Sequence, residues 1–243
     1  MLDTRTPSVA RAYDYLLGGE ACFAADRALA GRLLALYPRL ADTLIASRAR
    51  VADAVAGSAG QGVDQYLDIG AGLPTRPSTH ATARAIVPGA RVAYIDRDPA
   101  VVSHGAALVP PGVRYHDGDL TEPEALLAAL SGFIDFSRPV CLVLGLVIQA
   151  LDPGAARAVV GVLVKALSPG SCAVATVGAG DGGRLPDSVW PASPTEADLA
   201  GFLGGLDLLP PGVSKHGDVL CAVGVKPHPA GPPRADAPDH GRG

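Results

Sequence analysis

From residue 63 onward, short apolar runs alternate with segments of helical character. The runs "VDQYLDI", "RVAYID", "VRYHDG", "PVCLVLGLVI" and "SCAVATV" have the length and composition of buried strands. Between them, segments such as "THATARAIV" and "EPEALLAAL" space their apolar residues as helices do. This alternation predicts a parallel sheet covered by helices on both faces, which binds ligands at the carboxyl ends of its strands. The loops that directly follow the strands are therefore expected to carry the function.

Three regions are expected along the chain. Residues 1–60 contain three helix-like segments, "PSVARAYDYLLGG", "DRALAGRLLALYP" and "LADTLIASRARVADAVAG", and predict an N-terminal helical cap in which Pro7 opens the first helix. Residues 61–226 are expected to form the sheet domain, with "LDLLPPGV" and "DVLCAVGV" as its two closing strands. Residues 227–243 are rich in proline, glycine and charge, which predicts a disordered tail.

Composition excludes several kinds of protein. A hydrophobic content of 48% and a net charge of -4 predict a folded chain without the basic face that nucleic acid requires. The longest apolar run, "VCLVLGLVIQAL", is much shorter than the roughly 20 residues that span a membrane. The first residues lack an apolar signal region, so a cytoplasmic location is expected. The four cysteines are scattered without CxxC spacing, so buried thiols and no metal site are predicted.

Three acids are expected at the carboxyl ends of neighbouring strands. Asp68 ends the first run, Asp96 ends the second in "YID", and Asp119 follows the third in "DGDL". Each acid alone could equally cap a helix or form an Asx-turn. Together they favour a ligand site, and an acid at the position of Asp96 is suited to accept hydrogen bonds from both hydroxyls of a ribose.

The stretch "YLDIGAGLPT" bears on the type of cofactor. A dinucleotide loop has the pattern GxGxxG, because a negatively charged pyrophosphate approaches its backbone amides. Here Asp68 precedes only two glycines, Gly70 and Gly72, and Pro74 removes an amide donor. The loop therefore favours a cation such as the ammonium and sulfonium of S-adenosylmethionine, with an NAD-dependent oxidoreductase as the rival hypothesis.

These motifs also resemble a known family. "DIGAG", "YID" and "DGDL" resemble the cofactor motifs of class I, Rossmann-like S-adenosylmethionine-dependent methyltransferases. "ARAYDYLLGG" and "LDIGAGLPT" more specifically resemble a bacterial S-adenosyl methyltransferase family formerly labelled as a domain of unknown function, and the similarity extends from about Thr4 to Val225. The resemblance implies an α/β fold with a mostly parallel sheet of seven strands, the last antiparallel, flanked by helices and preceded by a helical cap.

The resemblance also implies site residues and the cofactor S-adenosyl-L-methionine. The implied cofactor-binding residues lie in the loops after the strands and in a lid formed by "RAYDYLLGG": Asp68, Gly70, Ala71, Gly72, Asp96, Arg97, Asp119, Leu120 and Tyr15. No catalytic base is assigned, because the candidate histidines His80, His104 and His116 fall within helices or beside a strand. Gln149 and Asp152 follow the fourth strand, where an acceptor would meet the methyl group, although Asp152 could equally cap a helix.

Two functions remain open from the sequence. The first is an S-adenosylmethionine-dependent methyltransferase that acts on a small molecule, without nucleic-acid or membrane partners. The second is a catalytically inactive S-adenosylmethionine-binding protein with a regulatory or partner-binding role. The second is motivated by two departures from the family pattern, which usually reads "GGKDNF" where this chain has "GGEACF", with Glu20 and Cys22, and has a histidine where this chain has Gln149. The family also usually has an asparagine near Ser47.

Overall fold

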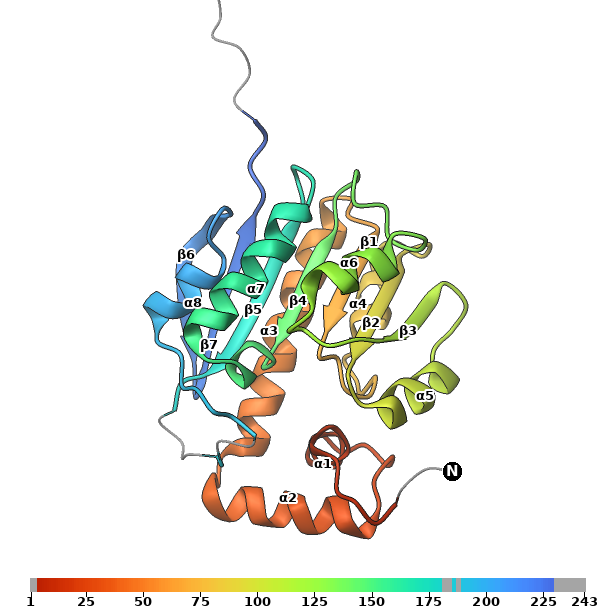
Figure 1. Cartoon of the computed structure of the whole chain (residues 1–243), viewed down its shortest axis with the longest axis vertical. Helices are drawn as coiled ribbons and strands as arrows, with labels where there is room; N and C mark the ends of the chain where they lie inside the picture. Colours follow the sequence, from red (N-terminus) through yellow and green to blue (C-terminus); the bar gives the residue numbers. More distant parts are fainter. Residues whose placement is uncertain (1–3, 181–184, 187–188, 230–243) are drawn as a thin grey trace, which may run out of the picture.

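The computed structural model describes residues 4–180, 185–186 and 189–229. Its centre is a seven-stranded sheet in the order β3-β2-β1-β4-β5-β7-β6 (Figure 1). The strands are β1 (Gln65–Ile69), β2 (Arg91–Asp96), β3 (Val113–Asp117), β4 (Cys141–Gly145), β5 (Cys172–Gly178), β6 (Asp207–His216) and β7 (Val219–Val225). Strands β1 to β5 pair in parallel, and β7 runs antiparallel to both of its neighbours. The predicted fold is therefore confirmed, including the antiparallel last strand.

Helices cover both faces of this sheet. They are α1 (Val9–Leu16), α2 (Ala24–Leu36), α3 (Leu40–Gly60), α4 (Thr79–Ile86), α5 (Pro99–Leu108), α6 (Pro123–Leu130), α7 (Pro153–Ala166) and α8 (Glu196–Phe202), with a short 3₁₀ turn, η1 (Ile148–Ala150), after β4. Helices α3, α4 and α5 share one face, and α6, α7 and α8 share the other.

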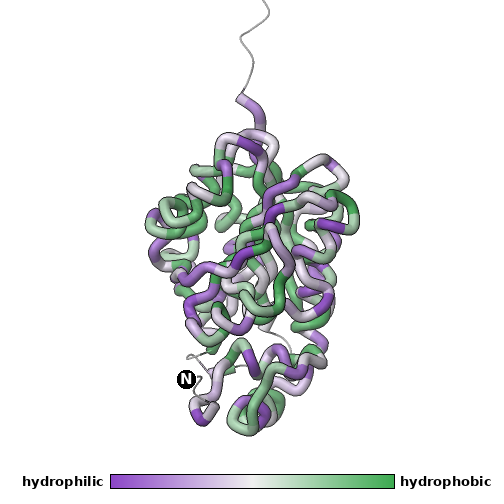
Figure 2. The backbone as a smooth tube through the Cα atoms, turned by 90° about the vertical axis from the view of Figure 1, so that its right-hand side faces the viewer, coloured by the Kyte–Doolittle hydropathy of each residue, from purple (hydrophilic) through white to green (hydrophobic). Residues whose placement is uncertain are grey.

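Alternation along the strands produces two hydrophobic cores. Successive side chains of a strand point to opposite faces, so Tyr66 packs with α3 and α4 while Leu67 packs with α6 and α7. Both side chains are almost fully buried. Figure 2 shows hydrophobic stretches of the chain, in green, throughout the body of the molecule. The continuous apolar runs in the sequence follow from this burial on both faces.

The boundaries of the first three helices differ slightly from the prediction. Helix α1 begins at Val9 because Ser8 acts as its N-cap, so Pro7 lies before the helix instead of opening it. Helix α3 continues past Gly57 to Gly60 and packs along β4, β5 and β7. The boundary predicted at residue 60 thus falls at the end of a helix that contacts both the cap and the sheet. The division into a helical cap, residues 1–60, and a sheet domain, residues 61–226, remains our proposal.

The two ends of the described chain lie at opposite ends of the sheet (Figure 1). The last residues described, up to 229, leave the sheet at the end away from α1 and α2. Most of the tail predicted to be disordered, residues 230–243, lies outside the described residues. No helix in the described part of the chain is long and apolar enough to cross a membrane.

Helices α1 and α2 are joined by a buried ion pair. The Arg11 Nε donates to Asp26 Oδ2 at 2.8 Å, and Asp26 also accepts hydrogen bonds from the amides of Ser8 and Phe23, each at 2.8 Å. Burial alone would raise the pKa of Asp26, but the bonds from Arg11, Ser8 and Phe23 outweigh it and lower that pKa. This carboxylate therefore orders the whole cap.

We expect Asp26→Asn to lower the free energy of unfolding by about 3 kcal/mol, because it leaves the buried Arg11 without its counter-ion. Urea unfolding measures the loss. Asp53→Asn is the matched control, since the Arg50–Asp53 pair is largely exposed and its removal should change stability by less than about 1 kcal/mol. Equal effects of the two variants would show that the buried pair does not organise the cap.

Candidate functional site

The loop after β1 depends on glycine. Gly70 and Gly72 have φ angles of 67° and 61°, in the left-handed region that disfavours other residues. A Cβ atom at Gly70 would also collide with the side chain of Val147, at the end of β4. The two glycines thus permit a sharp turn that packs closely against the neighbouring strand end.

The second glycine of this loop is held from two sides. Asp96 Oδ2 accepts a hydrogen bond from the Gly72 amide at 2.9 Å, and the Tyr115 hydroxyl donates to the Gly72 carbonyl at 2.9 Å. The rings of Tyr94 and Tyr115 stack with their centroids 4.8 Å apart. Residues of β2 and β3 therefore fix the position of a loop that follows β1. Burial raises the pKa of Asp96, although the amides of Asp98 and Gly72 oppose that increase.

Asp68 lies next to this loop at the end of β1. Its Oδ2 accepts a hydrogen bond from the Thr79 hydroxyl at 2.6 Å. Burial raises the pKa of Asp68 to about 6; Thr79 and the positive charge of Arg48 oppose the increase, and Asp96 adds to it. In the described structure no cationic group lies within ion-pair distance of this carboxylate. Asp68 is therefore a carboxylate that a bound cation would stabilise.

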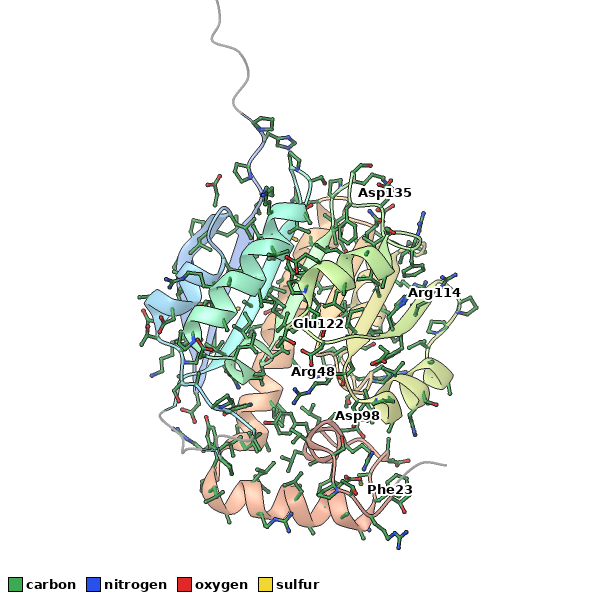
Figure 3. All side chains as sticks on the ribbon, viewed as in Figure 1. Phe23, Arg48, Asp98, Arg114, Glu122 and Asp135 are labelled. Atoms are coloured by element: carbon green, nitrogen blue, oxygen red, sulfur yellow. The ribbon has the colours of Figure 1, made fainter. Side chains whose placement is uncertain are left out.

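A cavity of about 460 Å³ lies between these loops and the cap. In Figure 3, Arg48 and Asp98 are found between the sheet and helices α1 and α2, whereas Asp135 lies at the other end of the sheet. The lining residues come from the strand-end loops, α1, α3 and the segment before α8, and include Asp68, Gly70, Ala71, Gly72, Asp96, Arg97, Asp98, Asp119, Leu120, Val147, Tyr13, Asp14, Leu17, Leu44, Ser47, Arg48, Val189 and Trp190. This volume is in the range of small-molecule sites.

The structure brings eight of the nine predicted cofactor-binding residues to one cavity. The exception is Tyr15, which is 42% exposed and does not line it. Its neighbours Tyr13 and Asp14 line the cavity instead, because each step along a helix turns the side chain by about 100°. Asp119 lines the cavity and also accepts hydrogen bonds from the amide and hydroxyl of Thr121. It therefore forms the Asx-turn that the sequence left open as an alternative to a role in ligand binding.

Other residues singled out in the sequence lie away from the cavity. Gln149 is 1% exposed; its Oε1 accepts a hydrogen bond from the Gly178 amide at 2.7 Å, which ties η1 to β5. Asp152 caps α7 by accepting from the amides of Gly154 and Ala155. Glu20 and Cys22 are also absent from the cavity wall.

The three candidate histidines are found in α4, α5 and β3, and none lines the cavity. In the part of the chain that the structure describes, no three His, Cys, Asp or Glu side chains are grouped to hold a metal ion.

Three residues of the wall were not assigned to the site from the sequence. Ser47, noted there only as a departure from the family pattern, and Arg48 lie on α3, which the sequence placed in the cap. Trp190 follows a segment rich in proline and glycine, and the one signal that could have identified it is that it is the single tryptophan of the chain. Their positions depend on how α3 and the segment after β5 fold back over the strand ends.

The cap is fixed over the cavity by side-chain hydrogen bonds. The Ser8 hydroxyl donates to Asp98 Oδ2 at 2.9 Å, and the Thr75 hydroxyl donates to Asp14 Oδ1. Asp14 also accepts from the Ala21 amide. Helix α1 therefore contacts both the start of α5 and the end of the glycine loop.

Comparison with known proteins agrees with this geometry. A family profile described as S-adenosyl methyltransferase matches residues 1–218. A crystal structure of a proposed methyltransferase from Thermobifida fusca YX is 32% identical, with a TM-score of 0.82 over 93% of this chain and 97% of that chain. A DUF574 family protein from Streptomyces avermitilis MA-4680 is 29% identical, with a TM-score of 0.79 over 93% and 99% of the two chains. No protein of curated function matches the sequence.

A more distant comparison concerns the fold alone. The N-methyltransferase NodS from Bradyrhizobium japonicum WM9 is 17% identical, with a TM-score of 0.51 over 74% of this chain and 96% of that chain.

The raised pKa of Asp68 predicts how stability depends on pH. The folded protein holds this proton up to about pH 6, whereas the ordinary value is near 3.8, so the stability of the wild type should fall as pH rises between these values. At pH 7 we expect Asp68→Asn to raise the free energy of unfolding by about 2 kcal/mol, and the gain should vanish near pH 4.

Urea unfolding at several pH values measures this difference. Asp135→Asn is the control: Asp135 is exposed, and hydrogen bonds from Ser137 lower the pKa of its carboxyl, so its replacement should bring no stabilisation. A pH-independent difference between the wild type and Asp68→Asn would contradict the prediction.

Proposed function

The chain belongs to the S-adenosyl methyltransferase family, and on that premise we propose that it methylates a small molecule. Its cofactor is S-adenosyl-L-methionine. The observation that carries the proposal is Asp68, a carboxylate with a raised pKa in the wall of a cavity that also contains Asp96 and Asp119. Three carboxylates at strand ends suit a ligand that is cationic and carries ribose hydroxyls better than one that carries a pyrophosphate.

The wall residues fit the parts of this cofactor. Asp68 would hold its ammonium group, next to the turn formed by Gly70, Ala71 and Gly72. The Asp96 carboxylate accepts one amide hydrogen bond on each oxygen, so lone pairs remain for the two ribose hydroxyls, with Arg97 beside them. Leu120 is 7% exposed and offers an apolar surface for the adenine, next to Asp119.

Methyl transfer asks mainly for alignment of two reactants. When bound, S-adenosylmethionine would supply an electrophilic methyl group for transfer to a lone pair of the acceptor, with S-adenosylhomocysteine as the leaving product. The residues of this chain would bind and orient the two reactants. Helix α1 would exclude water from them through its contacts with Asp98 and Thr75. None of the described residues that line the cavity is a histidine that could act as a general base.

The size and closure of the cavity support a small-molecule acceptor. A volume of about 460 Å³ must accommodate the acceptor together with part of the cofactor. The hydrogen bonds of Ser8 and Asp14 hold α1 against the strand-end loops, so that α1 forms one wall of this volume.

The rival hypothesis, an inactive cofactor-binding protein, rested on Glu20, Cys22 and Gln149. None of the three lines the cavity, so these departures from the family pattern lie outside the proposed site. Release of S-adenosylhomocysteine in the presence of a panel of neutral and charged small molecules separates the two functions. Release with none of them would favour the inactive protein.

We expect Asp68→Ala to weaken the binding of S-adenosylmethionine at least tenfold, because the substitution removes the carboxylate that would pair with the ammonium group of the ligand. It should not lower the melting temperature of the free protein, because the buried carboxylate destabilises the fold when it is ionised. Calorimetry and thermal unfolding measure the two effects. A lower melting temperature with unchanged affinity would assign Asp68 a purely structural role.

The same carboxylate predicts a pH dependence of binding. Since the pKa of Asp68 is about 6, the wild-type affinity should fall about tenfold between pH 7 and pH 5, and this dependence should be absent in Asp68→Asn. NAD is the control ligand, because it should not raise the melting temperature of the protein. Stabilisation by NAD and not by S-adenosylmethionine would reject the proposed function.

A further inference from the structure

Among the described residues, two basic side chains line the cavity, and they differ in position. Arg97 follows Asp96 at the end of β2 and is exposed. Arg48 comes from α3, is half-buried, and lies between the strand ends and helices α1 and α2 (Figure 3). Arg48 is therefore the basic residue that the cap contributes to the wall of the cavity.

The guanidinium of Arg48 has only neutral partners in the described part of the chain. It donates to the carbonyl oxygens of Thr75 at 3.1 Å and Leu73 at 3.3 Å. Both distances exceed the length of about 2.7–2.9 Å that is usual when a guanidinium donates to a carboxylate. Since a guanidinium has more N–H donors than these two contacts use, Arg48 retains donors for a ligand.

Arg48 has no counter-ion among the described residues, although carboxylates are near it. Asp14 and Asp68 line the same cavity, and both accept hydrogen bonds only from neutral donors. Neither forms an ion pair with Arg48. Burial raises the pKa of Asp68, and the charge of Arg48 opposes this increase, so the two groups lie close enough to interact. A cation and an anion thus line one cavity, near each other but unpaired.

Two separated charges of opposite sign favour a ligand that carries both charges. A guanidinium without a counter-ion is costly once a ligand displaces the water around it. A ligand that fills the cavity is therefore favoured when it brings an anion to Arg48 and a cation to Asp68. One small group brings both, because an α-amino acid carries an ammonium group and a carboxylate on the same carbon atom. S-adenosylmethionine ends in such a group, whereas its ribose and adenine carry no charge.

We infer that Arg48 binds the α-carboxylate of the cofactor while Asp68 binds its α-ammonium group, so that the two residues select ligands with an intact amino-acid end. The inference rests on the proposed function and adds a specificity-determining residue from helix α3. Arginine suits this role because its planar fork matches a carboxylate with two parallel hydrogen bonds. An acidic acceptor could also bring a carboxylate, but it would leave the nearness of Arg48 to Asp68 without a reason.

A pair of ligands that differ by one carboxylate tests this inference on the full wild-type chain. S-adenosylhomocysteine has the complete amino-acid end, and S-adenosyl-3-thiopropylamine keeps the ammonium group but lacks the carboxylate. We expect calorimetry to show that S-adenosylhomocysteine binds at least tenfold more tightly, because a hydrogen-bonded charge pair is lost with the carboxylate. Equal affinities of the wild type for the two ligands would overturn the inference.

Arg48→Gln should remove this preference, because glutamine keeps a hydrogen-bond donor without the charge. The affinity for S-adenosylhomocysteine should fall at least tenfold, while that for S-adenosyl-3-thiopropylamine should stay the same or rise, since Arg48 repels its ammonium group. Arg50→Gln is the matched control and should keep the full preference: Arg50 is on the same helix, pairs with Asp53 at 2.9 Å and does not line this cavity. An equal loss for both ligands in Arg48→Gln would overturn the inference and assign Arg48 a structural role.

A second pair of probes tests whether the carboxylate belongs to the acceptor instead. The wild type and Arg48→Gln, each saturated with S-adenosylhomocysteine, are titrated with 4-hydroxybenzoate and with 4-hydroxybenzamide, which differ in charge but little in size. We expect no preference for the acid that depends on Arg48, because the cofactor already occupies the guanidinium. A preference for the acid that is lost in Arg48→Gln would overturn the inference and assign Arg48 to the acceptor.

The wild-type measurements also separate this inference from the proposed function. If the wild type binds neither adenosyl ligand, the proposed function fails. If it binds both with equal affinity, the proposed function stands and the role of Arg48 alone is rejected.

Discussion

Ionising two carboxylates at neighbouring strand ends costs free energy, and much of the surrounding structure lowers that cost. Burial is the main cause of the raised pKa of both Asp68 and Asp96, and the charge of Asp96 adds to it for Asp68, as that of Asp98 does for Asp96. Amides of the glycine loop and of the start of α5 donate to Asp96, a hydroxyl from α4 donates to Asp68, and the charge of Arg48 favours ionised Asp68. The loops, the helix starts and α3 thus all supply groups that favour the ionised form of these two carboxylates.

The cap takes part in the same arrangement through polar contacts. Ser8, the N-cap of α1, also reaches Asp98, which is itself the N-cap of α5. Asp26 orders the segment before α1 by accepting from the Ser8 amide. A chain of hydrogen bonds therefore links the buried ion pair of the cap to the end of β2, and a disturbance of the cap reaches the carboxylate wall through few intermediates.

The sequence predicted those features that depend on neighbours along the chain. Strand periodicity and the acids after the strands identified the fold and most of the carboxylate wall, because parallel strands bring their carboxyl ends together whatever else the chain does. Tyr15, selected from the lid segment as a cofactor-binding residue, does not line the cavity whereas Tyr13 does, because the side of α1 that faces the site depends on how the cap docks. Tyr115 gave no local signal, since it supports the glycine loop from β3, and Ser47 was noted only as a departure from the family pattern, since it meets Thr176 across 129 positions of the chain.

Helix α3 gives the cavity walls of unequal stiffness. Its first half carries Leu44 and Ser47 into the cavity, while its second half buries Val55 and Ala59 in the core of the sheet. One continuous helix therefore makes this wall as rigid as the sheet itself. Helix α1, in contrast, has eight residues, packs against α2 through the Arg11–Asp26 pair and reaches the strand-end loops by the hydrogen bonds of Ser8 and Asp14. The cavity therefore lies between one wall that is continuous with the sheet and one wall that belongs to the cap.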